Sequence, residues 1–122
     1  MKQLPQLIST YTQLPAGTEK QLHWAELLRW LERLSDSEFI DEVSDITPPV
    51  DPLDANRIAA WVAVACRNRQ VDVPDWTWTV KPLEVPWFPT KHPLLRLELM
   101  IHAPLECRRR KVFDLHGYGD AV

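Results

Sequence analysis

The side chains that could bind a metal or act as a nucleophile are four histidines and two cysteines, Cys66 and Cys107. No two of them have the short spacing of a zinc-ligand motif, so we expect no metal site. A basic run, Arg108 to Lys111, follows Cys107 and could lower the pKa of its thiol, but the sequence places no general base beside it. Three scattered glycines build no phosphate-binding loop. We therefore expect no metal, no cofactor and no nucleophilic centre.

Arg96 and His102 match the Arg-x(4–6)-His spacing of helical ribonucleases of the HEPN type. In such enzymes the histidine assists proton transfer and the arginine stabilises charge on the phosphate. The pattern is weak, because roughly one match is expected by chance, and because Arg109 and Arg110 also precede His116 at permitted spacings. On an ideal helix Arg96 and His102 point about 120° apart. We expect a protein that is not an enzyme, with a small ribonuclease using Arg96 and His102 as the alternative.

Charge is unevenly distributed along the chain. The formal net charge is -3, but seven acids and no base lie between Ser35 and Asn56. Such a block is usually a solvated face, and less often a docking face for a basic partner. The basic run Arg108 to Lys111 has no second basic stripe beside it and is typical of a solvated helix end. A nucleic-acid partner is therefore not expected, although the sequence leaves open whether this run contacts nucleic acid.

Helical signals dominate the first half of the chain. Apolar residues recur at helical spacing from about Glu19 to Leu34 and predict a helix with Thr18 as its N-cap. Ser35 and Glu38 have the spacing of a capping box, which predicts a short helix immediately afterwards.

The second half of the chain is richer in proline and tryptophan. Asp51-Pro52 is a strong helix start and predicts a helix over about 52–69. In the following strap, residues 71–90, Trp76 to Val80 alternate like a short strand, but no second strand is evident to pair with it. Pro93 can open a helix of about ten nearly all apolar residues, which we expect to be buried on several sides.

These elements predict a mainly α fold: a compact bundle of about five helices with a Pro/Trp-rich extended strap and little or no β structure. A length of 122 residues fits a single domain over 1–122. Residues 2–14 have apolar residues at helical spacing and could form a short helix. The two ends of the chain, 1–17 and 114–122, are the parts where loose order is expected. The longest apolar run, Ile58 to Cys66, is too short for a bilayer, which needs about 20 residues. With only two cysteines and no signal peptide, a cytoplasmic protein is expected, with no membrane partner.

Five stretches of the second half resemble an uncharacterised bacterial family, and they are Val73–Thr77, Pro86–Thr90, Leu95-Arg96, Ala103-Pro104 and Val112-Phe113. The most specific part is Pro-Trp-Phe-Pro at 86–89, and the resemblance covers about residues 50–115. Members of that family are often encoded beside a nucleotidyltransferase-like protein in what look like toxin–antitoxin pairs. The resemblance implies an antitoxin-like protein with a nucleotidyltransferase-like toxin as its partner. This chain departs from the family pattern at Glu106-Cys107-Arg108.

The leading hypothesis is a non-enzymatic, antitoxin-like domain that binds a protein partner. The acidic block would meet a basic cleft on the toxin, while large aromatic side chains supply buried apolar contact. The residues expected to bind the partner are Asp36, Glu38, Asp41, Glu42, Trp30, Trp87 and Phe88. A further alternative is a self-associating helical domain that buries its apolar surplus in a homodimer.

Overall fold

The computed structural model describes residues 2–115 and shows a helical protein. Within that range, the isolated parallel bridge between Trp87 and Val112 is the only β pairing. The predicted mainly α fold with little or no β structure is therefore confirmed. The helices are α1 (Leu4–Gln13), α2 (Thr18–Arg33), α3 (Asp36–Val43), α4 (Pro52–Arg69), α5 (Trp76–Thr79), α6 (Pro93–His102) and α7 (Leu105–Arg108).

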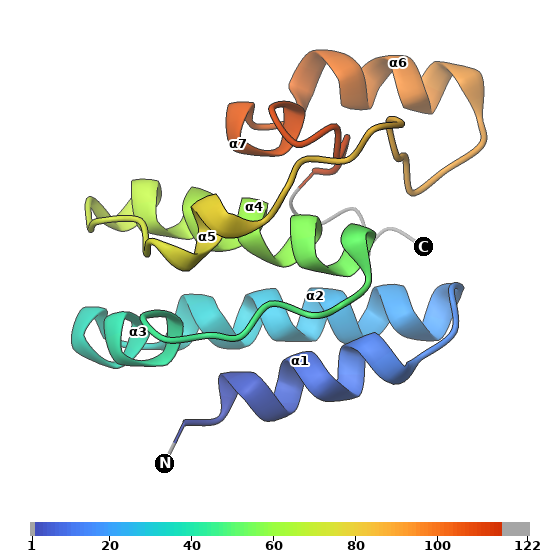
Figure 1. Cartoon of the computed structure of the whole chain (residues 1–122). Coiled ribbons are helices and arrows are strands. Elements are labelled where there is room, and N and C mark those ends of the chain that lie inside the picture. Colours follow the sequence, from blue (N-terminus) through green and yellow to red (C-terminus); the bar gives the residue numbers. More distant parts are fainter. Residues whose placement is uncertain (1, 116–122) are drawn as a thin grey trace.

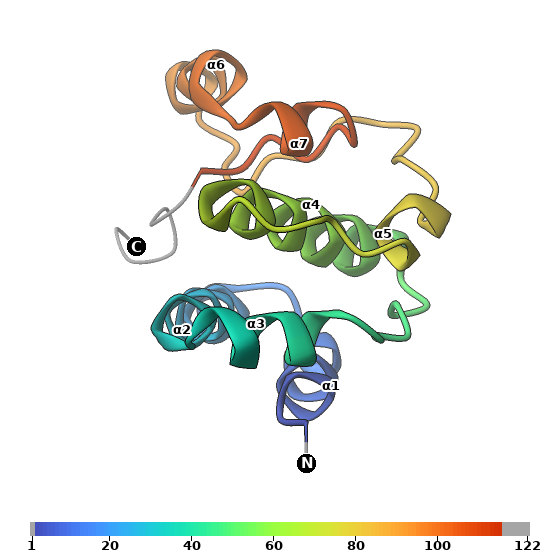
Figure 2. The same cartoon turned by 90° about the vertical axis from the view of Figure 1, so that its left-hand side faces the viewer.

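The helices are stacked in layers, with α4 in the middle (Figures 1 and 2). Helices α1, α2 and α3 lie on one side of α4, and α6 and α7 lie on the other. Because both faces of α4 are covered, apolar residues on all its sides are buried, including Ala59, Ala60 and Val62. Each large apolar side chain buried in this way contributes roughly 1.5–3 kcal/mol.

Local capping explains where the central helices begin. Ser35 Oγ accepts from the Glu38 amide at 3.2 Å, and Glu38 Oε1 accepts from the Ser35 amide at 2.9 Å, which is the predicted capping box of α3. Asp51 Oδ2 likewise accepts from the Asp54 amide at the start of α4. The expected N-cap of α2 is wrong, because Thr18 is already helical and Gly17, with φ of 149°, occupies the cap position without a side-chain bond.

The two ends of the described range are anchored in the core. For residues 1–17 the sequence allowed a short helix or loose order, and the structure shows helix α1, with Leu4, Ile8 and Tyr11 buried. Asp114 was expected to begin a loosely ordered tail, but it is buried. The rest of that expectation, for residue 1 and residues 116–122, lies outside the described residues.

The strap between α4 and α6 differs from its prediction at Trp76 to Val80. Residues Trp76–Thr79 form the short helix α5 rather than a strand-like segment, and Val80 is its C-cap. No partner strand is present in the described range, so the threonines bond locally: Thr77 Oγ1 donates to Pro74 O at 2.8 Å, and Thr79 Oγ1 donates to Trp76 O at 2.7 Å. Trp76 fixes this turn to α3 by donating from Nε1 to Val43 O at 2.7 Å.

Candidate protein-interaction surface

Helix α6 begins at a well-formed cap at the end of the strap. The Nδ1 atom of His92 accepts from the Leu94 amide at 3.2 Å, and Pro93 occupies the first helical turn, where its missing N–H costs nothing. The helix ends at His102, just before Ala103-Pro104. Its position at one edge of the molecule leaves it in contact with the rest of the chain on one side (Figures 1 and 2).

Helix α6 is apolar and exposed, which corrects the expectation that it is buried on several sides. Of its apolar side chains only Leu99 is fully buried, at 2% exposure. Exposures from 44% to 68% are found for Leu94, Leu95, Leu97, Met100 and Ile101. A concentration of five large apolar side chains on ten residues is what an interaction surface presents. We call these five residues the α6 apolar surface.

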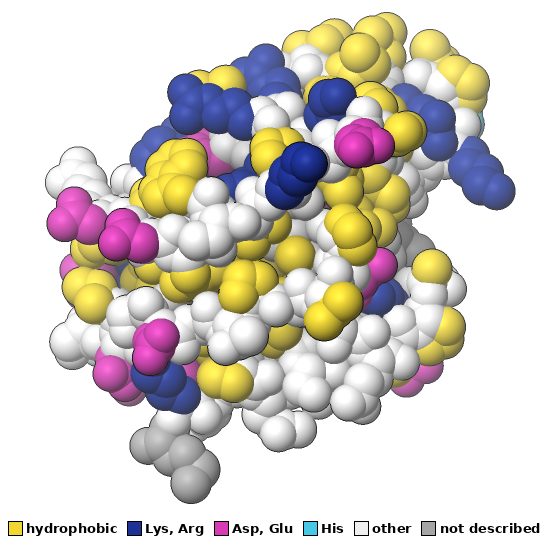
Figure 3. Space-filling model, in the orientation of Figure 1, with side chains coloured by type: hydrophobic (Ala, Val, Ile, Leu, Met, Phe, Trp, Pro, Cys, Tyr) yellow, Lys and Arg dark blue, Asp and Glu magenta, His cyan; other side chains and the backbone are white. Residues whose placement is uncertain are grey.

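Positive charge flanks the α6 apolar surface. Lys91 precedes the helix, Arg108 and Arg109 follow it in and after α7, and all three side chains are exposed. Figure 3 shows hydrophobic groups gathered over α6, with Lys and Arg side chains on both sides of them. The other two members of the basic run differ from these: Arg110 is buried, and Lys111 is exposed, with its Nζ donating to Glu84 O at 3.0 Å.

Arg96 fastens α6 to the strap. Its Nε donates to Thr90 O at 2.7 Å, and its guanidinium lies 4.9 Å from the centre of the Phe88 ring. Phe88 in turn stacks on Phe113 at 4.9 Å. His102 is exposed and pairs with Glu98 on the same helix at 3.5 Å. Arg96 and His102, the two residues of the ribonuclease alternative, therefore contact different groups. The contacts of Arg96 hold α6 to the strap.

Trp87 and Phe88, expected at a partner interface, join the strap to the rest of the chain. The Trp87 amide donates to Lys111 O at 2.8 Å, and its carbonyl accepts from the Phe113 amide at 2.9 Å. The Trp87 ring lies 4.9 Å from the guanidinium of Arg57. Both aromatic side chains are half-buried, so the segment Pro86–Pro89 holds the strap against the rest of the chain.

The acidic residues expected to face a partner have different environments. Glu42 is buried and caps α1: its Oε1 accepts from the amides of Gln3 at 2.9 Å and Leu4 at 3.0 Å. The expectation that Glu42 is exposed and faces a partner is therefore wrong. Glu38 is exposed but serves the capping box, where the Ser35 amide and then its hydroxyl lower the pKa of the Glu38 carboxyl.

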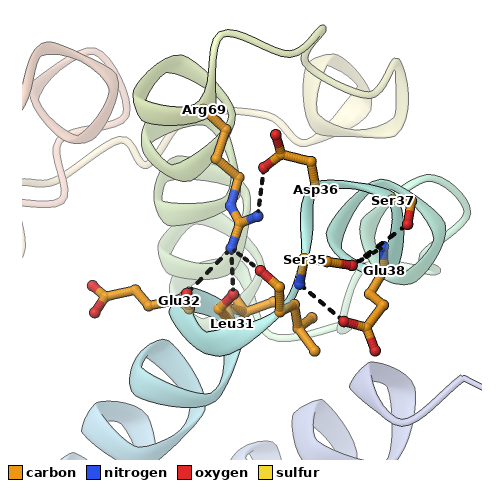
Figure 4. Close-up of polar contacts among 8 residues, drawn as sticks. Leu31, Glu32, Ser35, Asp36, Ser37, Glu38 and Arg69 are labelled. Carbon is orange, nitrogen blue, oxygen red and sulfur yellow. Dashed lines mark hydrogen bonds and ion pairs between the residues drawn. The ribbon is translucent and has the colours of Figure 1, made fainter.

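Asp36 is joined to α4 by an arginine clamp (Figure 4). Arg69 donates to Asp36 Oδ1 at 2.9 Å and to the carbonyls of Leu31 and Leu34 at 2.9 and 2.8 Å. Asp36 nevertheless remains exposed on its other side, and Asp41 is also exposed.

Trp30 is half-buried. It packs against the core and lines an open depression between α1 and α2.

A buried arginine at the centre of the molecule was not predicted. Arg57 is 1% exposed, and its Nε donates to Asp114 Oδ2 at 2.7 Å. It also donates to Tyr11 Oη at 3.1 Å and Gln21 Oε1 at 2.8 Å. Burial alone would lower the pKa of Arg57, but the negative charge of Asp114, the charge interaction with Tyr11 and the hydrogen bonds to both groups together outweigh it, so the pKa is raised. The available signal was the position of Arg57 directly before the apolar run Ile58 to Cys66, far from the arginines that end the helix, Arg67 and Arg69.

Neither cysteine has the environment of a nucleophile. Burial raises the pKa of Cys66 to about 11, and burial also raises the pKa of Cys107. No cluster of three or more potential metal ligands occurs among residues 2–115. In the same range, no helix has the length and apolar composition needed to cross a membrane.

Comparisons with protein-family models, with curated proteins and with solved structures gave no match to this chain.

Proposed function

We propose that this protein is a non-enzymatic protein-binding domain, antitoxin-like in role, that docks through the α6 apolar surface. The observation that carries the proposal is the exposure of five large apolar side chains on one ten-residue helix. Removing such a surface from water is the main driving force for association, at about 25 cal/mol per Å². The resemblance of residues 50–115 favours a nucleotidyltransferase-like toxin in the cytoplasm as the partner.

The charges beside α6 define the chemistry of the partner. Because Lys91, Arg108 and Arg109 are exposed on both sides of the helix, the complementary surface is an apolar groove with an acidic rim. This replaces the acidic block as the main contact, since Glu42 is buried and Glu38 serves a cap. Asp36 and Asp41 remain exposed and available for secondary contacts with a basic part of the same partner.

The test is co-purification with the product of the neighbouring gene, which the proposal expects to be a nucleotidyltransferase-like protein. We expect a complex at micromolar concentration that is lost in the double variant Leu97→Glu/Ile101→Glu, because carboxylates on α6 would face the acidic rim. Leu22→Glu is the matched control: Leu22 is 45% exposed but lies on α2, so binding should be retained. Absence of a complex with the unaltered chain would refute the proposed partner.

Light scattering on the isolated chain separates this proposal from the homodimer alternative. A monomer agrees with a heterologous partner for α6. A dimer that the Leu97→Glu/Ile101→Glu variant converts to monomer would assign the α6 apolar surface to a second copy of the chain and overturn the proposal. The ribonuclease alternative has no observation in its favour, given the separate contacts of Arg96 and His102.

A further inference from the structure

A pocket of about 150 Å³ opens to solvent between α4, α5 and α7, away from the α6 apolar surface. Apolar groups, among them Pro82, form part of its wall. The remaining wall carries aromatic and charged groups: Trp78, Glu106, Arg109 and Arg110. A cavity of about this size holds a benzene-sized ring. The pocket can therefore accept one six-membered aromatic ring.

Arg110 supplies a positive charge without a counter-ion. It is buried, and its hydrogen bonds go to neutral oxygens: Asn56 Oδ1 at 3.2 Å, Val80 O at 2.9 Å, and Thr77 O. Among the described residues no carboxylate lies within ion-pair distance of it. Buried charges in proteins are ordinarily paired. The wall of this pocket therefore favours an anion, and the exposed guanidinium of Arg109 adds a second positive charge at its rim.

Glu106 supplies an acceptor that lacks a donor. Its Oε2 pairs with Arg67 Nε at 2.6 Å, but Oε1 is buried, with less than 1 Å² accessible, and has no hydrogen-bond partner. A buried acceptor left unsatisfied is uncommon and destabilising. Glu106 lines the pocket, so contact between a ligand and Oε1 requires the exposed side chains of the pocket wall to change rotamer, a motion of picoseconds to nanoseconds. An N–H group on that ligand would satisfy Oε1.

Trp78 supplies a flat surface. Its side chain is 66% exposed although it is a large aromatic group on a short, internally bonded helix. Exposed tryptophan rings beside arginines are used to stack planar bases, since every base has a π face.

From these four groups we propose that the pocket binds a nucleotide whose base carries an amino group. The base stacks on Trp78, the amino group donates to Glu106 Oε1, and the phosphate lies near Arg109 and the charge of Arg110. The same chemistry is offered by a free mononucleotide and by one nucleotide of a single-stranded RNA. The single-ring base of cytidine monophosphate matches the size of the pocket, with the ribose and phosphate at its open rim, so this nucleotide is the probe. This pocket shares Arg109 with the basic flank of the α6 apolar surface, but its test uses the isolated chain and does not depend on the partner proposed for α6.

Calorimetric titration of the intact chain with cytidine monophosphate is the first test. We expect saturable binding at one site, weakened about tenfold or more in Arg109→Gln and in Trp78→Ala, because a charge-assisted bond or a stacking surface is lost. Arg108→Gln is the matched control, since Arg108 is also exposed and adjacent in sequence but is not among the residues that line the pocket. No saturable binding at millimolar nucleotide would overturn the proposal, as would an equal loss in Arg108→Gln.

Glu106→Gln tests the recognition of the base. Glutamate can only accept at this position, whereas glutamine can also donate. The unaltered chain should prefer cytidine monophosphate, with its amino group, over uridine monophosphate, with its carbonyl. Glu106→Gln should abolish or reverse this preference, while a general loss of folding would weaken both ligands equally. Equal affinity of the unaltered chain for both nucleotides would refute the role of Glu106.

A single-stranded oligocytidine distinguishes the two sources of the ligand. If the oligonucleotide binds more tightly than the monophosphate and loses affinity in Trp78→Ala and Arg109→Gln, the ligand is an RNA strand. If only the monophosphate binds with this variant pattern, the ligand is a free nucleotide. The proposed site would be refuted if the oligonucleotide bound with the same affinity to both variants as to the unaltered chain, and the monophosphate did not bind.

Discussion

Burial determines what the reactive side chains of this protein can do. Cys107 precedes three arginines and a lysine, a setting that in an exposed loop would favour the thiolate. In the folded chain the thiol is fully buried, and burial raises its pKa despite the nearby charges of Arg57 and Arg110. The sequence shows which charges are near in the chain, whereas desolvation depends on packing from other helices.

Both cysteines should resist thiol reagents in the native state. Burial raises the pKa of Cys66 to about 11, so at pH 8 it is a protonated, inaccessible thiol, as is Cys107. We expect no reaction with Ellman's reagent at pH 8 except at the rate of unfolding, and two equivalents in denaturant. Rapid modification of either thiol in the native protein would contradict the structure.

Glu38 should make stability depend on pH through the α3 cap. Hydrogen bonds from Ser35 lower its pKa in the folded state below the ordinary value of 4.5. Its contribution is therefore present above about pH 4.5 and is lost as pH falls through the lowered folded pKa. Glu38→Ala should be less stable than the unaltered chain at pH 7, and the difference in melting temperature should shrink below pH 4.5. Glu38→Gln, which retains a capping acceptor, is the control and should lack this pH dependence.

At the scale of the helices, a single side chain from α3 caps the N-terminus of α1. Glu42 projects from α3 and accepts from the first amides of α1, where the helix dipole also favours a negative charge. Glu42, which belongs to the acidic block by sequence, is thus the cap of a helix that is distant in the chain. Its role depends on a residue 38 positions away.

Replacing Glu42 should loosen α1. Glu42→Ala removes charge-assisted hydrogen bonds and should lower the free energy of unfolding by about 1.5–3 kcal/mol. Amide hydrogen exchange should rise most in Leu4–Gln13. Asp41→Ala, at an exposed neighbouring position, is the matched control and should change stability by no more than about 0.5 kcal/mol. Equal effects of the two variants would show that Glu42 does not hold α1.

Elements that depend on local signals could be predicted from the sequence, and those that depend on neighbours could not. The capping box of α3 and the Asp-Pro start of α4 act within one turn, so the residues themselves specify them. Whether α6 is buried depends on which helix covers it, and its composition alone suggested a core position. The Trp-Thr alternation of α5 likewise lacked the partner strand that would have made it extended. The pocket at Trp78 combines residues from α4, α5 and α7 and left no pattern in the sequence.

At the scale of the whole molecule, Arg57 joins segments from both sides of α4. It contacts Tyr11 of α1, Gln21 of α2, Asp114 near the end of the described range and the Trp87 ring of the strap. The pair with Asp114 is nearly free of solvent, and Trp61 Nε1 also donates to Asp114 Oδ2 at 3.0 Å. The arrangement makes the docking of the C-terminal segment and of the N-terminal helices interdependent.

This interdependence predicts a large, cooperative effect of one substitution. Asp114→Asn leaves the buried guanidinium of Arg57 without a counter-ion and should lower the free energy of unfolding by about 3–5 kcal/mol, measured by urea denaturation. Asp36→Asn is the control, because its ion pair with Arg69 is exposed and should be worth no more than about 1 kcal/mol. Fluorescence and circular dichroism should report the same midpoint for Asp114→Asn, since the layers share the arginine. A cost no greater than that of Asp36→Asn, or separate midpoints for the two signals, would mean that the layers are held together by apolar packing alone.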